Sequence, residues 1–138
     1  MKILSKLLLA LVLLSAFTCN KDVIPPDNSI TLNGNWNMKN VSGGLIGLNL
    51  DYNPGEVIWN FNTTTEKLSV TNNIITTGPK SIYARYATGL YDFYTTTINS
   101  MEYLYVDSAR VGTITIGTNA LLLDDGIDVD GFLTRFEK

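Results

Sequence analysis

Beyond the first thirty residues, hydrophobic and polar positions alternate along the chain in short runs. Val57, Trp59 and Phe61 stand at every second position, and the same alternation recurs in residues 67–71 and 111–116. Successive side chains of a β-strand point to opposite faces of a sheet, so this period of two predicts strands with one buried face. No long stretch of this region has the period of a helix. The chain is therefore predicted to be all-β.

Residues that favour tight turns, such as Asn72-Asn73, Asn99-Ser100 and Asp125-Gly126, separate these runs at short intervals. Many short strands on short turns predict a sandwich or an up-and-down barrel, and closure into a barrel leaves no exposed edges. We therefore expect a small antiparallel up-and-down barrel of about eight strands. Residues 43–50 are the least strand-like segment, and we expect a lid loop or a short helix there. The expected strands cover residues 35–42, 55–62, 66–72, 81–86, 90–98, 102–107, 111–116, 119–124 and 131–137.

The start of the chain has the pattern of an export signal. Lys2 and Lys6 precede an apolar run, residues 7–17, that is interrupted only by Ser15. These 11 residues are too few for a membrane-spanning helix, which needs about 20. A basic start, a short apolar run and small residues at its end are typical of a signal peptide.

Cys19, the only cysteine, follows the apolar run by two residues. Residues 15–19 resemble a lipobox, which implies cleavage before Cys19 and its lipidation. Ordinary cleavage after Ala16, leaving a free thiol, is the alternative. Residues 20–28 contain two prolines and several Asn and Asp residues, as expected of a tether. The predicted organisation is a signal peptide at 1–18, a lipidated tether at 19–29 and a barrel domain at 30–138. The location implied is the cell envelope, with the outer membrane preferred and its two faces left open.

Composition narrows the possible functions. Of the 10 basic residues, Lys2 and Lys6 belong to the signal, so 8 remain against 13 acidic ones and the net charge becomes about −5. Such a chain is a poor partner for nucleic acid, which is bound through clustered Lys and Arg. The chain has no histidine, the commonest general base and metal ligand. We therefore expect no enzyme, no cofactor and no metal site.

Gly34 and Trp36 form a Gly-x-Trp sequence at the start of the first expected strand. It resembles the first signature of lipocalins and other calycins, in which the tryptophan closes one end of the barrel. The resemblance implies that an arginine near the last strand stacks on this tryptophan, and Arg135 is the matching position. The chain as a whole resembles the short lipocalin-like lipoproteins of Bacteroidota.

Several aromatic residues are candidates for a ligand-binding wall. Tyr91 and Phe93 share a face of one expected strand, as Tyr103 and Tyr105 do in the next, and we expect the two pairs to meet across the hairpin. Cross-strand pairs that only stabilise the sheet are the alternative. The full set of candidates is Trp59, Phe61, Tyr91, Phe93, Tyr103 and Tyr105.

The predicted function is the binding or carriage of a small apolar or amphipathic ligand by a protein attached to the membrane through Cys19. The alternative is a structural or interaction protein with a filled barrel, which binds an envelope protein or a glycan. An enzyme on the same scaffold is the third and least favoured hypothesis.

Two short motifs add smaller expectations. Residues 107–109 resemble the Asp-Ser-apolar sequence at which exported Bacteroidota proteins are O-glycosylated, and Ser108 would carry the glycan, although Asp-Ser is also common in turns. Acidic residues near the end invite comparison with a calcium loop. In this sequence the first position of such a calcium loop would be a glycine, and no helix flanks the segment. An acidic turn before the last strand is therefore the preferred interpretation. These acidic residues are Asp124, Asp125, Asp128, Asp130 and Glu137.

Overall fold

The computed structural model describes residues 30–138. The predicted signal peptide, Cys19 and the rest of the predicted tether lie outside the described residues. The described part of the chain forms strands, one short α-helix and one 3-10 helix. In order they are β1 (Gly34–Gly43), β2 (Leu48–Asp51), β3 (Val57–Asn62), β4 (Lys67–Asn72), α2 (Pro79–Tyr83), β5 (Gly89–Ile98), β6 (Met101–Val106), β7 (Ala109–Ile116), β8 (Ala120–Asp124), η1 (Ile127–Val129) and β9 (Phe132–Glu137).

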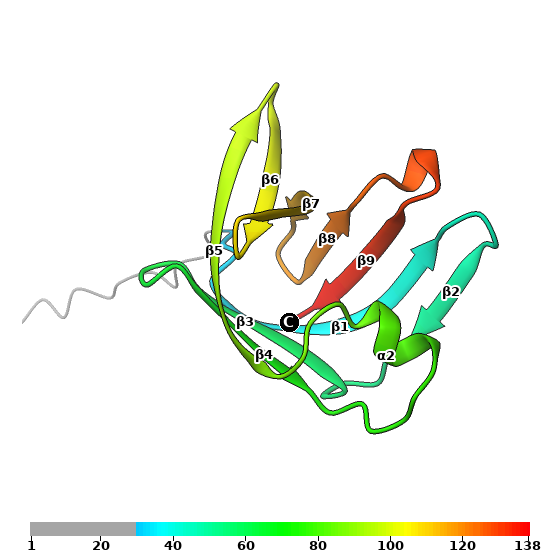
Figure 1. Ribbon diagram of the computed structural model, residues 1–138. Helices are drawn as coiled ribbons and strands as arrows, with labels where there is room; N and C mark the ends of the chain where they lie inside the picture. The colour runs from blue at the N-terminus through cyan, green and yellow to red at the C-terminus, as the bar shows by residue number, and fades with distance from the viewer. Residues whose placement is uncertain (1–29) are drawn as a thin grey trace, which may run out of the picture.

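Eight of the strands close into an antiparallel barrel (Figure 1). Strands β3 to β8 each pair with the next strand in the chain, and β9 returns to pair with β1, which in turn pairs with β3. The predicted up-and-down barrel is therefore confirmed. Closure gives every barrel strand a partner on both sides, which removes the free edges of an open sheet.

Strand β1 is long enough to serve two partners along one edge. Its first residues, 34–37, pair with β3, whereas residues 40–43 pair with β2. Strand β2 is therefore an extra strand outside the closed ring. The side-chain amide of Asn40 donates to Asn49 and Asp51, at 2.7 and 2.9 Å, and attaches β2 to β1.

The alternation read from the sequence decides which side chains fill the barrel. In β3, the residues Val57, Trp59 and Phe61 are buried, and the polar or half-buried residues between them point outward. The same parity holds in β4 and β9. The largest fully buried side chains are Trp36, Trp59, Phe61, Phe136, Met38, Leu68, Leu104, Leu121 and Leu123. One continuous apolar core therefore lies inside the barrel.

Two segments differ from the prediction. Residues 43–50, expected as a lid loop or helix, form a turn followed by β2, because the Asn40 amide and the edge of β1 hold residues 48–51 in an extended conformation. Residues 81–86, expected as a strand, belong to α2 and the turn after it. Pro79 presets the first helical position and has no amide proton to lose, so a helix begins there. Ser81 accepts from the Gly78 amide and donates to the Gly78 carbonyl, which fixes this start.

Candidate functional site

Aromatic side chains occupy the barrel interior around Trp59. The Trp59 ring centroid lies 4.9 Å from that of Phe136 and 6.0 Å from that of Phe61. Phe61 in turn makes an edge contact with Phe93 at 5.0 Å. The candidates Trp59, Phe61 and Phe93 therefore lie together, but as packed core residues rather than as the wall of a deep cavity. A ligand would meet this cluster only from an end of the barrel.

The expected meeting of Tyr91 and Phe93 with Tyr103 and Tyr105 was wrong. Across the hairpin, Phe93 is the partner of Val106, and Tyr105 is the partner of Tyr94. The turn between the two strands has two residues, Asn99 and Ser100, and both have positive φ. A turn of this length sets the register of the hairpin, and here inward residues of β5 lie opposite inward residues of β6. Tyr94 and Tyr105 consequently stack on the outer face, with centroids 4.7 Å apart and ring planes at 6°. Tyr103 also lies outside the barrel, and Tyr91 is half-buried against Tyr86.

The barrel end near Trp36 is closed. Trp36 is fully buried, and its indole Nε1 donates to the Leu32 carbonyl at 2.7 Å. The cation over its ring is Lys138, whose Nζ lies 4.8 Å from the centroid. Arg135, the residue expected to stack there, points outward between the buried Thr134 and Phe136 and pairs with Glu137 at 3.1 Å. The position of Arg135 in the alternation of β9 prevents it from reaching Trp36.

The opposite end is covered by residues 73–88, which we call the lid and which contain α2 (Figure 1). Two tyrosines of the lid contact the barrel. Tyr83 packs on Phe132 with centroids 4.9 Å apart, and Tyr86 packs on Trp59 at 5.5 Å. We call this covered end the mouth. The lid therefore seals the mouth through aromatic contacts with the core itself.

Polar contacts hold the lid at its edges. Lys80 pairs with Glu56 at 2.9 Å, and the Tyr52 hydroxyl donates to the Lys80 carbonyl at 3.0 Å. On the other side, Arg85 pairs with Asp125 of the β8–β9 connection. The hydrogen bond from Lys80 is the main cause that lowers the pKa of the Glu56 carboxyl. Burial, helped by the nearby Glu56 charge, raises the pKa of Tyr52 to about 12. Burial is also the main cause that raises the pKa of Tyr86.

A small, mostly apolar hollow of about 210 Å³ lies between the lid and the barrel. Tyr83 and Phe132 give it aromatic walls, and the Arg85–Asp125 pair lies at its border. Its lining residues are Val41, Ile82, Tyr83, Arg85, Asp125 and Phe132.

Two buried polar atoms near this end have no protein partner. The indole Nε1 of Trp59 and the hydroxyl of Thr134 are both buried, and neither makes a hydrogen bond within the described chain. Thr134 is the register partner of Val41, which lines the hollow, and Trp59 contacts the lid residue Tyr86. An unpaired buried polar group destabilises a fold by about 1–3 kcal/mol. Neither residue is among those that line the hollow.

The remaining predicted residues lie elsewhere. Ser108 is exposed in the β6–β7 turn, where Asp107 accepts a hydrogen bond from the Asp92 amide at 3.0 Å. Its glycosylation stays a prediction. Asp124 and Asp125 serve the turn before β9, where Asp124 accepts from the amides of Gly126 and Ile127 at 2.8 Å each. Within residues 30–138, no three acidic or other ligating side chains gather as a metal site would require.

The lid was the part of the site that sequence reasoning missed. Tyr83 and Tyr86 belong to the segment expected as a strand, residues 81–86. The pair Gly78-Pro79 is the sequence signal that a helix starts there.

Comparison with family models, curated proteins and solved structures finds no match for this chain. Among the residues that the structure describes, no helix combines the length and the hydropathy that crossing a membrane requires.

Proposed function

We propose that this chain is an exported, lipid-anchored envelope protein whose barrel binds a small amphipathic ligand at the mouth, beneath the lid. The observation that carries the proposal is the apolar hollow beneath the lid, one of whose lining residues, Val41, is the register partner of Thr134, which has a buried hydroxyl without a partner. An apolar wall with a few polar groups is the usual composition of a small-molecule site. The closed eight-stranded barrel is compatible with a lipocalin-like binding fold.

The packing of the interior limits the size of the ligand. Trp59, Phe61 and Phe136 are almost fully buried and Trp59 contacts both phenylalanines, so the ligand does not penetrate deeply. The hollow of about 210 Å³ is smaller than the roughly 300 Å³ of an ordinary ligand pocket. A larger ligand would enter by displacing the lid, whose aromatic contacts with Trp59 and Phe132 it would replace.

The proposed anchor and the mouth lie at opposite ends. Ile30 and Leu32 border a hollow at the closed end together with Thr63 and Glu66 of the β3–β4 turn, whereas the lid covers the other end. If lipidated, Cys19 would be joined to the barrel by the predicted tether, 19–29, whose 11 residues reach at most about 40 Å. We propose this binding role without catalysis, as the lack of histidine indicates.

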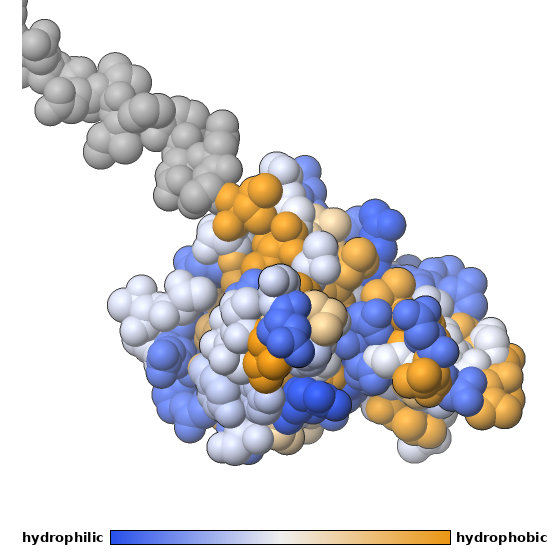
Figure 2. All heavy atoms as spheres, turned by 90° about the horizontal axis from the view of Figure 1, so that it is seen from above, coloured by the Kyte–Doolittle hydropathy of each residue, from blue (hydrophilic) through white to orange (hydrophobic). Residues whose placement is uncertain are grey.

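The second candidate function is an interaction protein with a filled barrel, which binds an envelope protein or a glycan. The packed core favours it, and so do the large apolar side chains exposed around the mouth. Leu45, Ile46, Ile82 and Val129 are each more than two-thirds exposed. Apolar residues also gather in separate patches among hydrophilic ones when the molecule is viewed from above (Figure 2). Exposed apolar patches often mark contacts with a partner.

Native mass spectrometry after incubation with an envelope lipid extract tests the first candidate. We expect a stoichiometric adduct on the wild type and its loss in Thr134→Val, which removes one orienting hydroxyl and changes little else. Thr115→Val, at an exposed position of β7, is the matched control and should keep the adduct. Bare protein mass in every sample, or an adduct that Thr134→Val retains in full, would favour the interaction protein instead.

A further inference from the structure

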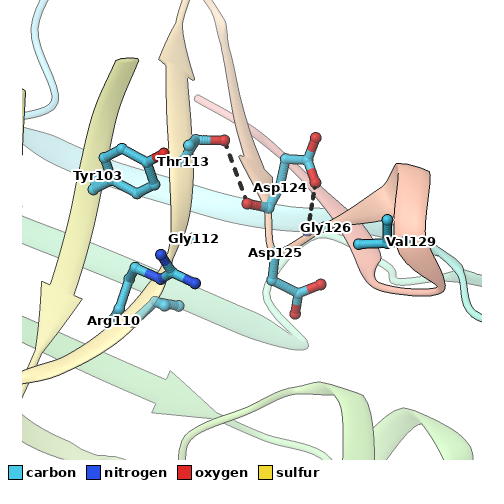
Figure 3. Close-up of a pocket in the computed structure, with 9 residues that line it drawn as sticks. Tyr103, Arg110, Gly112, Thr113, Asp124, Asp125, Gly126 and Val129 are labelled. Atoms are coloured by element: carbon cyan, nitrogen blue, oxygen red, sulfur yellow. Dashed lines mark hydrogen bonds between the residues drawn. The ribbon is translucent and has the colours of Figure 1, made fainter. Parts of the chain in front are cut away.

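A second hollow lies outside the barrel core, where β7 and β8 separate (Figure 3). In the ladder between these strands, Ile116 pairs with Leu121 at one end and Thr113 pairs with Asp124 at the other. Residues 109–112, at the start of β7, have no partner in β8. The barrel wall is therefore split at this point. The split leaves a groove of about 340 Å³ between the start of β7 and the β8–η1 connection.

Local geometry fixes the split. The register between β6 and β7 shifts after Leu104, so that Val111 is an additional residue and β7 bends. At the bend Gly112 passes so close to β8 that a Cβ atom there would lie 2.4 Å from the Asp124 carbonyl oxygen. Only glycine fits this position, so Gly112, which lines the groove, permits the close approach of β7 to the end of β8.

Arg110 projects into the groove from β7 (Figure 3). Its guanidinium lies 5.7 Å from the centroid of the Tyr103 ring, and it makes no ion pair within the described part of the chain. A guanidinium that stacks on an aromatic ring keeps its N–H groups free to donate hydrogen bonds. Two of these N–H groups lie in one plane at the spacing of the two oxygens of a carboxylate. Arg110 is therefore a preformed donor for an anionic group.

The opposite wall carries two carboxylates whose charges are already engaged. Asp124 accepts from two backbone amides, both at Oδ1, and Asp125 pairs with Arg85 and accepts from the Phe132 amide. These contacts leave Oδ2 of Asp124 as an acceptor for hydroxyl groups. The Thr113 hydroxyl, 3.4 Å from the Asp124 carbonyl, adds a further acceptor. A simple anion would be attracted by Arg110 but repelled by the two carboxylates on the opposite wall. A simple cation would be repelled by Arg110.

We propose that this groove binds a sugar that carries a carboxylate, of the uronic acid class. Arg110 pairs with the carboxylate, Asp124 and Thr113 accept from ring hydroxyls, and Tyr103 and Val129 cover the apolar face of the sugar. Val129 is 80 % exposed in the ligand-free groove. This site is separate from the mouth and does not depend on the function proposed above.

The test is a two-dimensional amide NMR titration of the full-length protein in detergent, with methyl β-D-glucuronide as the probe. Methyl β-D-glucoside and sodium acetate are the matched controls, because each has only half of the recognised chemistry. We expect saturable shifts at residues 110–113 and 124–126 with the glucuronide, at an affinity of about 1 mM. Binding of either control should be at least about five-fold weaker. Arg110→Met should weaken glucuronide binding at least ten-fold and Arg110→Lys by less, while Lys39→Met in β1 should leave it unchanged.

Each other outcome overturns the proposal. Equal affinity for acetate would make the groove an anion site without sugar recognition, and equal affinity for the glucoside would remove the role of Arg110. Saturable shifts confined to the lid would place the sugar at the mouth. The absence of saturable shifts with all three probes would show that the groove does not bind such sugars.

Discussion

Replacing Thr134 with valine should make the ligand-free protein more stable. Thr134 is fully buried between Val41 of β1 and Leu123 of β8, and its hydroxyl has no protein partner. Burial of an unpaired hydroxyl destabilises a protein by about 1–3 kcal/mol, and valine keeps nearly the same shape while replacing that hydroxyl with a methyl group. We expect the free energy of unfolding to rise by about 1–2 kcal/mol. For a domain of about 100 residues, each kcal/mol raises Tm by roughly 4–8 °C.

Urea unfolding, followed by tryptophan fluorescence, measures this change. The chain has two tryptophans, Trp36 and Trp59, and both are fully buried, so unfolding changes the surroundings of both. The protein should first be shown to be free of ligand by native mass spectrometry, since bound ligand would stabilise the wild type selectively. Thr115→Val in β7 is the control, because its side chain is exposed and its substitution should change the free energy by less than about 0.5 kcal/mol.

A decrease in the free energy of unfolding of Thr134→Val would refute the reasoning. That result would mean that the Thr134 hydroxyl makes a favourable hydrogen bond in the ligand-free protein. The orientation of a ligand by Thr134 would then lose its physical basis, whereas Trp59 Nε1 could be tested separately.

Three further predictions concern the anchor, the closed end and the lid. Cys19→Ala should move the protein from the membrane fraction to the soluble fraction; retention on membranes after high-salt and carbonate washes would contradict lipidation. Lys138→Met should lower the free energy of unfolding by about 0.5–1 kcal/mol in urea, because it removes the cation over Trp36, whereas Arg135→Met should change it by less than about 0.5 kcal/mol. Ionisation of Tyr52 is opposed in the folded state, where its pKa is about 12 against 10.0 ordinarily. The stability that the neutral Tyr52 phenol contributes should therefore be complete below pH 10 and be lost as pH rises through about 12. In urea unfolding, the Tyr52→Phe variant should lack this part of the loss of stability at alkaline pH.

The strands were predictable wherever alternation and turn residues agreed. Val57, Trp59 and Phe61 were assigned to one buried face, and the structure buries all three. The prediction of residues 81–86 as a strand was wrong because a short apolar run does not distinguish a strand from a helix, and Pro79 starts α2 just before it. Strand β2 was missed because residues 48–51 owe their extended form to a partner, β1, that local sequence does not reveal.

The candidate site was less predictable than the fold. Of the aromatic residues proposed as a ligand-binding wall, Trp59, Phe61 and Phe93 lie in the barrel core, whereas Tyr103 and Tyr105 lie on the outer face. Which tyrosine of β5 meets Tyr105 depends on hairpin register, and a shift of one residue exchanges the two faces of a strand. Similarly, Lys138 rather than Arg135 covers Trp36, since the strand direction at the end of β9 decides which cation reaches the ring.

The sequence by itself determined the all-β class, the approximate number of strands and the inward residues of most of them. These properties follow from the period of side-chain burial and from turn residues, which act over a few neighbouring positions. Only the tertiary structure decided the lid over the mouth, the partnerless Thr134 hydroxyl and the groove beside Arg110. Each of these joins residues distant in the chain, so its existence depends on register and packing across strands, which no local pattern specifies.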